Sequence, residues 1–342
     1  MDQQWQTSMA TLSQGRDLTR EQTRGAFEQV MSGAVPDAEI EFLLRALLKK
    51  GECVEEIVGA AQAMRAGATR VHSDAECIDT CGTGGDGIST FNVSTTAAII
   101  ASAAGAVVAK HGNRSTTRAS GSTEVLTGLG INVEADLSTV ERCLNEIGIA
   151  YLNARMLHPA MKRAASARRA IPGRTTFNLL GPLTNPAGAR RQVLGVPNRG
   201  MGELIAGALL ELGTDHAWVV RGDDGLGDLT VTSETQVVEI CGRSKREFQV
   251  CPEEVGLGRH SLETLRVDSP KRSAEVVLEI LSGVRGGPRD HALLNAGAAL
   301  LVAGKAMGLK EGVARASEVL DNGAALAKLN EWRALAGVCG ER

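Results

Sequence analysis

Glycine and hydroxyl residues are concentrated in one stretch of the 342-residue sequence, DTCGTGGDGISTFNVSTTAAII, which spans residues 79–100. Glycines permit positive φ and let backbone N–H groups approach an anion closely, and a helix that begins there adds the positive end of its dipole. Asn92, Ser94 and Thr95 lie where such a helix would begin, and their side chains can donate to phosphate oxygens. The stretch predicts a phosphate or pyrophosphate site, with an elaborate tight turn and an ordinary helix cap as the alternative.

The spacing of Gly82, Gly84 and Gly87 also satisfies GxGxxG, the pattern of a dinucleotide-binding unit. Such a unit needs an acidic residue about 20 positions further on, at the end of the second strand, to bind the ribose. That strand is expected to end at Lys110 and His111. A basic residue there favours binding of a further phosphate group rather than of ribose hydroxyls. The Walker pattern GxxxxGK(S/T) does not occur in the sequence.

A second donor-rich stretch, KHGNRSTTRASGS, covers residues 110–122 and contains three cations, Lys110, Arg114 and Arg118. Its neutral donors include Asn113, Ser115, Thr116 and Thr117. Both stretches follow expected strands, so they should emerge side by side at the carboxyl edge of a parallel sheet, where ligands bind in open α/β folds. A solvated charged loop is the alternative, and His111 is expected to belong to the site.

The first part of the chain is expected to be helical. Thr19 and Gln22 have the spacing of a capping box, and the apolar residues of DAEIEFLLRALLKKG form a wide stripe on a helix that ends at Gly51. A further helix is expected over residues 54–65, and no strand before about residue 70. The stripes either pack on one another or form a shared dimer face.

From residue 77 the sequence pattern changes to short apolar runs. Each run is followed by a glycine-bearing turn and a helical pattern, which is typical of β-α units. Strands are expected at 77–80, 106–109, 149–152, 193–196 and 217–220. Helices are expected at 94–104, 123–129, 139–147 and 202–212, with Ser138 and Glu141 as a capping box. Residues 158–180 read as helical and basic, and are expected to join the N-terminal helices in space.

The expected fold is therefore α/β: a small all-helical N-terminal domain plus a larger α/β domain with a mostly parallel central sheet flanked by helices. We expect residues 1–74, joined in space by residues 160–190, to form the helical domain, and residues 75–159 and 191–342 to form the other. A net charge of −3 and a pI near 6.1 argue against a nucleic-acid or anionic-membrane partner. Seven scattered cysteines fit neither disulfides nor zinc, and with no leader or apolar span they predict a cytoplasmic protein.

Four strings in order carry a family resemblance: GTGGDG at 82–87, FNVST at 91–95, KHGNRS at 110–115 and RTTFNLLGPLTNPA at 174–187. With the sequence around them, from about residue 18 to residue 323, they resemble the anthranilate phosphoribosyltransferase family. The resemblance implies transfer of ribose 5-phosphate from phosphoribosyl pyrophosphate to anthranilate, a Mg²⁺ cofactor and a homodimer formed through the helical domains. It implies electrostatic and positional catalysis without an assigned acid or base. The rivals are a related nucleoside phosphorylase, another phosphoribosyltransferase, or a catalytically weak relative that binds nucleic acid.

The resemblance also implies roles for particular residues. Those expected to bind phosphoribosyl pyrophosphate are Gly82, Gly85, Asp86, Thr90, Asn92, Val93, Ser94, Thr95, Lys110, Arg114, Ser115 and Ser122. Those expected at the anthranilate site are Gly82, His111, Asn113, His158 and Arg168. A guanidinium such as that of Arg168 is independently a natural partner for a carboxylate.

Two departures from the family's pattern stand out. Where the family has Asp-Glu for magnesium, this sequence has Gly227 and Asp228, and its usual Ser-Ser-Lys is Thr117, Arg118 and Ala119. Magnesium binds through one or two carboxylates together with substrate phosphates and waters. We therefore expect a magnesium site at Ser94 and Asp228, with compensation from Asp223 or Asp224.

Overall fold

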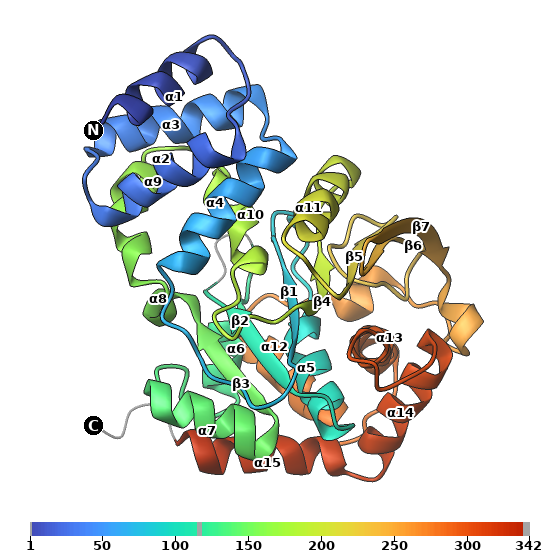
Figure 1. The fold of residues 1–342 in the computed structure, drawn as a ribbon. Helices are drawn as coiled ribbons and strands as arrows, with labels where there is room; N and C mark the ends of the chain where they lie inside the picture. Colours follow the sequence, from blue (N-terminus) through green and yellow to red (C-terminus); the bar gives the residue numbers. More distant parts are fainter. Residues whose placement is uncertain (1, 115–117, 338–342) are drawn as a thin grey trace.

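In the computed structural model, which describes residues 2–114 and 118–337, four helices open the chain (Figure 1). They are α1 (Gln3–Ser13), α2 (Arg20–Ser32), α3 (Asp37–Lys50) and α4 (Val54–Ala66). The capping box predicted at the start of α2 is confirmed, because the Gln22 amide donates to Thr19 Oγ1 and the Thr19 amide donates to Gln22 Oε1.

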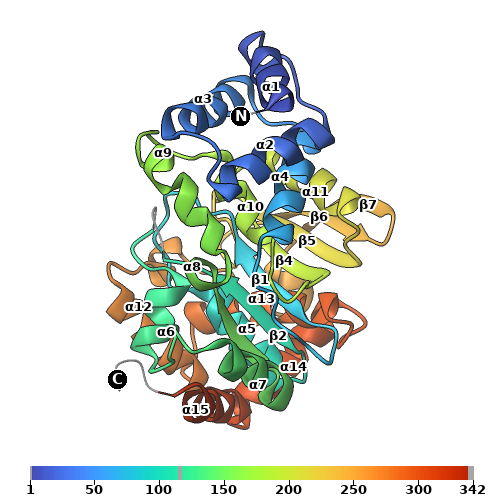
Figure 2. The same ribbon diagram turned by 60° about the vertical axis from the view of Figure 1, so that its left-hand side comes forward.

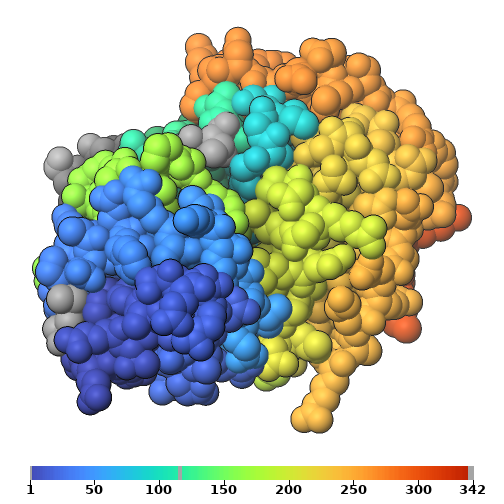
Figure 3. Space-filling view, turned by 90° about the horizontal axis from the view of Figure 1, so that it is seen from above, coloured from blue at the N-terminus to red at the C-terminus, as the bar shows by residue number. Residues whose placement is uncertain are grey.

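The middle of the chain returns to these helices. It forms α8 (Ala154–Leu157), the 3₁₀ helix η1 (Pro159–Ala164), α9 (Ala165–Arg169), α10 (Thr176–Leu180) and η2 (Gly181–Leu183). The Phe27 and Phe177 rings lie 5.3 Å apart in the core that α9 and α10 share with the N-terminal helices. Figures 2 and 3 show the two chain segments, blue and light green, side by side.

Within the described residues the strands form one seven-stranded sheet in the order β3-β2-β1-β4-β5-β6-β7. The strands are β1 (Ile78–Gly82), β2 (Val108–Gly112), β3 (Ile149–Asn153), β4 (Arg191–Gly195), β5 (His216–Gly222), β6 (Thr235–Cys241) and β7 (Ser244–Val250). The first five pair in parallel and confirm the predicted strands within one to three residues, whereas the antiparallel β6 and β7 were not predicted.

Side chains that alternate along the strands connect the sheet to two cores. Val193 and Trp218 belong to the core beneath the sheet, which includes α5 (Val93–Ala103) and α13 (Gly287–Val302). Leu194 and Val219 face the other way, towards the core that α11 (Arg199–Glu211) shares with the N-terminal helices. Both faces of the sheet are therefore covered. The N-terminal helices, with α9 and α10, form a helical layer that shares its core with the face carrying Leu194 and Val219.

The remaining helices complete the α/β part. They are α6 (Ser122–Gly128), α7 (Leu137–Ile147), η3 (Pro252–Val255), η4 (Leu262–Leu265), α12 (Pro270–Leu281), α14 (Leu309–Asp321) and α15 (Ala324–Ala336). The predicted cap of α7 was wrong, because the residue that caps it is Asp136, whose carboxylate accepts from the Thr139 amide and the Ser138 hydroxyl. Across the described chain, no helix has the length and apolar character needed to cross a bilayer.

Candidate active site

A cavity of about 570 Å³ lies at the carboxyl ends of β1 to β4, where the sheet meets the helical layer. Its floor comes from the ends of these strands and from the loops that follow them, including Gly82, Gly112 and Gly195. Its other wall comes from α4 and the segment from α8 to η2, including Met64 and Arg168. The two donor-rich stretches thus meet in one cavity, at the edge predicted for them.

The first loop takes its shape from glycines. Gly84, Gly85 and Gly87 have φ of 68°, 92° and 71°, a region that other residues rarely adopt. A Cβ at Gly82 would lie 3.2 Å from the Gly195 carbonyl oxygen, so the strand ends approach closely. Asn92 then caps α5, since its Oδ1 accepts from the Thr95 amide at 3.0 Å, and the loop delivers a helix N-terminus to the cavity.

Lys110 joins the two loops. Its side chain is buried, and Nζ donates to the Thr80 carbonyl oxygen at 2.6 Å and to Ser94 Oγ at 3.1 Å. Burial lowers the pKa of Lys110, although the negative charge of Asp79 opposes that change. The ammonium group is therefore fixed at the start of α5, beside the space where an anion would lie.

Asp79 and Asn185, which the sequence analysis did not single out, hold this arrangement. Asp79 Oδ1 accepts from the His111 amide at 3.1 Å, and its Oδ2 accepts from Asn185 Nδ2 at 2.8 Å. The same Asn185 nitrogen donates to the Ala109 carbonyl oxygen at 2.8 Å. Burial raises the pKa of Asp79 to about 6 despite the nearby Lys110 charge. A carboxylate in the middle of an expected strand, directly after Ile78, was the available sequence signal.

The opposite half of the cavity contains aromatic side chains and several cations, and the guanidinium of Arg168 packs on one of the aromatic rings. The rings of His111 and His158 lie 5.1 Å apart, and the Arg168 guanidinium carbon lies 5.2 Å from the Phe177 ring centroid. Burial lowers the pKa of His111 to about 3 and also lowers that of His158, so both rings are neutral near pH 7. Neutral rings with a nearby cation suit a flat aromatic acid.

Most of the residues expected at the substrate and metal sites line the cavity. Those that line it are Gly82, Asp86, Asn92, Ser94, Lys110, His111, Asn113, Arg114, Ser122, His158, Arg168 and Asp228. Gly85, Thr90, Val93 and Thr95 do not line it; Thr90, Val93 and Thr95 are buried, and the Thr95 amide donates to the capping side chain of Asn92. Ser115 lies outside the described residues. Arg155, Lys162 and Arg169, which no motif pointed to, also line the cavity.

Asp223 and Asp224 lie outside the cavity lining. The Asp224 carboxylate accepts from the hydroxyls of Thr230 and Thr232, and that of Asp223 accepts from Gln236 Nε2. Asp228 and Ser94, in contrast, line both the cavity and a small void next to it. Burial raises the pKa of Asp228 to about 6, and a buried carboxylate beside a hydroxyl is a suitable partner for a hard divalent cation.

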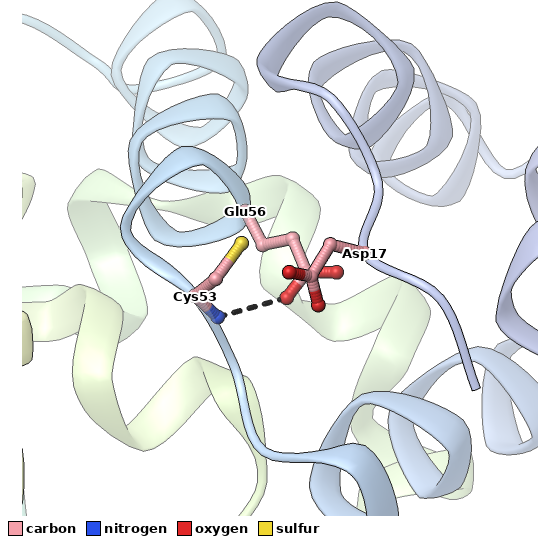
Figure 4. Close-up of side chains that lie close together, drawn as sticks. All are labelled: Asp17, Cys53 and Glu56. Carbon is pink, nitrogen blue, oxygen red and sulfur yellow. Dashed lines mark hydrogen bonds between the residues drawn. The ribbon is translucent and has the colours of Figure 1, made fainter.

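A second group of possible metal ligands, Asp17, Cys53 and Glu56, lies in the helical part (Figure 4). Lys50 already supplies the cation there, since its Nζ contacts Asp17 Oδ1 at 2.6 Å and Glu56 Oε2 at 2.9 Å. The fully buried Glu56 also accepts from the backbone amides of Leu18 and Cys53. The group therefore functions as a structural link between α3, α4 and the loop before α2.

Comparison with known proteins agrees with this geometry. Residues 7–68 match the glycosyl transferase family helical bundle domain, and residues 74–326 match the a/b domain of the same family. The anthranilate phosphoribosyltransferase of Anaeromyxobacter sp. (strain K) is 48% identical over 327 residues, which cover 95% of this chain and 97% of that protein. The enzyme of Roseiflexus sp. (strain RS-1) is 47% identical, with 92% and 93% covered.

Solved structures agree as well. The crystal structure of anthranilate phosphoribosyltransferase from Thermus thermophilus is 39% identical, with a TM-score of 0.90 over 96% of this chain and 99% of that one. The Saccharomyces cerevisiae enzyme in complex with phosphoribosyl pyrophosphate and Mg has a TM-score of 0.90 at 26% identity, with 98% of each chain covered. This chain therefore belongs to the anthranilate phosphoribosyltransferase family.

Proposed function

We propose that this chain transfers the 5-phosphoribosyl group of phosphoribosyl pyrophosphate to the amino group of anthranilate, releasing pyrophosphate, as a step of tryptophan biosynthesis. The observation that carries the proposal is the cavity in which two donor loops, joined by the contact of Lys110 with Ser94, lie opposite a wall that carries aromatic rings and the Arg168 guanidinium. A doubly phosphorylated sugar fits the first half, and an aromatic acid fits the second.

We assign the donor to the half of the cavity formed by the loops. Gly82, Asn92, Ser94 and Lys110 would hold the pyrophosphate at the start of α5, where N–H groups and the helix dipole favour negative charge. Arg114 and Ser122 line the same side and would contact the remaining phosphate. Asp228 and Ser94 would hold magnesium, which neutralises charge on the pyrophosphate leaving group.

We assign anthranilate to the aromatic half. Arg168 would bind its carboxylate with the planar fork of the guanidinium, which Phe177 orients, and Asn113 lies next to His111 on the loop that faces the donor. His111 and His158 line this half, their imidazoles are neutral, and they would contact the ring of anthranilate. This placement would leave the amino group directed towards C1 of the ribose.

The reaction forms the C1–N bond, breaks the C1–O bond to pyrophosphate and releases one amine proton. The sugar carbon passes through an oxocarbenium-like state, so fixed cations and donors around the departing pyrophosphate lower the barrier, and each good donor contributes about 10²-fold to 10³-fold in rate. Anthranilate's amine is already neutral, so positioning the two substrates matters more than a strong base.

We also propose a cytoplasmic homodimer that associates through the N-terminal helices. Phe42 on α3 is an aromatic side chain of these helices that is 42% exposed, so its apolar surface is available to a second copy of the chain. Size-exclusion chromatography with light scattering tests the dimer, and Phe42→Glu should shift it to monomer. A monomeric wild type would contradict this part of the proposal.

The activity is tested by mixing the purified protein with magnesium, phosphoribosyl pyrophosphate and anthranilate, and following the loss of anthranilate fluorescence. Thymidine with phosphate in a parallel reaction tests the nucleoside phosphorylase alternative. Salt-dependent retention on immobilised single-stranded DNA tests the nucleic-acid alternative. Turnover in either of the other arms with no loss of anthranilate would overturn the proposal.

A further inference from the structure

Arg118 lies between the two carboxylates that line the cavity in the described chain, Asp86 and Asp228. Its Nε donates to Asp86 Oδ1 at 2.9 Å, and its Nη2 contacts Asp86 Oδ2 and reaches Asp228 Oδ2 at 3.2 Å. The side chains of Asp86 and Asp228 are only 1% and 9% exposed. A guanidinium is thus fixed in a largely buried position at the donor end of the cavity.

Gly227 makes this arrangement possible. Its amide donates to Asp86 Oδ2 at 3.0 Å, and a Cβ at this position would lie 3.5 Å from the same oxygen. A carboxylate on residue 227 would therefore extend into the space next to Asp86 and add negative charge where Asp86 already carries it. Glycine removes that charge, and the positive charge that the family carries at the position of Ala119 lies here at Arg118, so both differences are among the departures from the family's pattern found in the sequence.

The contacts also limit what a metal ion could use. Both oxygens of Asp86 accept hydrogen bonds, from Arg118 and from the Ile88 and Gly227 amides, so Asp86 is committed to the protein. Asp228 receives the longer contact from Arg118, at Oδ2. The Oδ1 atom of Asp228, together with Ser94, would then serve a single divalent ion.

We propose that Arg118 is a built-in cation for the pyrophosphate of the donor and replaces the charge that a second carboxylate-bound metal ion would supply. The inference rests on the proposed function, because it assigns Arg118 to the donor in that same site. A guanidinium is a permanent cation whose planar fork matches phosphate oxygens, and Asp86 and Asp228 hold it in place before the donor arrives. We therefore expect the affinity for the donor to depend less on the concentration of free magnesium in this chain than in a site that holds the pyrophosphate only through metal ions bound to carboxylates.

The test is calorimetric binding of phosphoribosyl pyrophosphate to the wild type and to Arg118→Ser, each in excess magnesium and in EDTA. The wild type should lose less than about tenfold in affinity in EDTA, whereas Arg118→Ser should lose a further factor of about 10 to 100, the size expected for a hydrogen bond to a charged group. The matched control is Arg142→Ser, which removes an exposed arginine of α7 paired with Glu146 and should behave as the wild type.

A second measurement uses the wild type alone, since Arg118→Ser leaves Asp86 unpaired and could unfold. Titration with Mn²⁺, followed by electron paramagnetic resonance at saturating phosphoribosyl pyrophosphate, should count one tightly bound ion per chain. Two ions, wild-type binding that disappears in EDTA, or tighter binding by Arg118→Ser would each overturn the inference. Absence of donor binding by the wild type under every metal condition would instead overturn the proposed function.

Discussion

Replacing Arg168 with alanine should weaken anthranilate binding far more than donor binding. Among the described residues the Arg168 guanidinium contacts the Phe177 ring, at 5.2 Å from its centroid, and no carboxylate there is paired with it. A hydrogen bond to a charged partner contributes about 1.5–3 kcal/mol, so the variant should raise the KM for anthranilate by about 10-fold to 150-fold. The KM for phosphoribosyl pyrophosphate should change by less than about twofold, since the donor loops are untouched.

The assay is the initial rate of fluorescence loss, with each substrate varied at saturating amounts of the other. Arg168→Lys keeps the charge but loses the planar fork, so its KM for anthranilate should lie between those of the wild type and Arg168→Ala. Arg163→Ala is the matched control, because Arg163 is an exposed arginine of the preceding η1 helix, lies outside the cavity lining and should have a small effect. Equal increases in both KM values for Arg168→Ala would refute its assignment to the acceptor.

Three further predictions concern the metal, pH and stability. Asp228→Ala should shift the magnesium titration of activity to higher concentration by at least about tenfold without abolishing activity; an unchanged titration would remove Asp228 from the metal site. Asp79 has a pKa raised to about 6 by burial, above its ordinary 3.8, so its contribution to stability is complete below 3.8 and is lost as pH rises through about 6. The Tm of the wild type should therefore fall relative to that of Asp79→Asn from pH 4 to pH 7, and a constant difference would contradict this reasoning. Lys50→Met should lower the free energy of unfolding by about 3 kcal/mol because the buried Glu56 loses its cation, whereas the exposed Lys49→Met should change it little, and equal denaturation midpoints would show that the pair contributes nothing.

The parts of the fold with local signals were predictable from the sequence. Thr19 and Gln22 lie three residues apart and cap α2 as expected, and the glycines from Gly82 to Gly87 form the turn that their spacing indicated. The cap of α7 was misassigned because Ser138 and Asp136 are both good capping residues, two positions apart. Local chemistry alone does not choose between them.

Other features depend on partners distant in sequence. The strand β7, SKREFQV, has few apolar residues because it forms the edge of the sheet next to β6, so the apolar pattern that marked β1 to β5 is weak there. The contact of Arg118 with Asp228 joins residues 110 positions apart, which no spacing rule indicates. Thr90 has a hydroxyl suited to phosphate, but the fold buries it away from the cavity.

The segment that carries Arg168 packs on α3, a helix that does not itself line the cavity. Arg45 Nη2 on α3 donates to the Ala170 carbonyl oxygen at 2.8 Å, directly after α9. A substitution at Arg45, on the outer side of this helical layer, would thus change the position of the Arg168 guanidinium and leave the donor loops unchanged. If Arg168 binds the acceptor as proposed, the choice among aromatic amines depends also on α3, whose residues do not line the cavity.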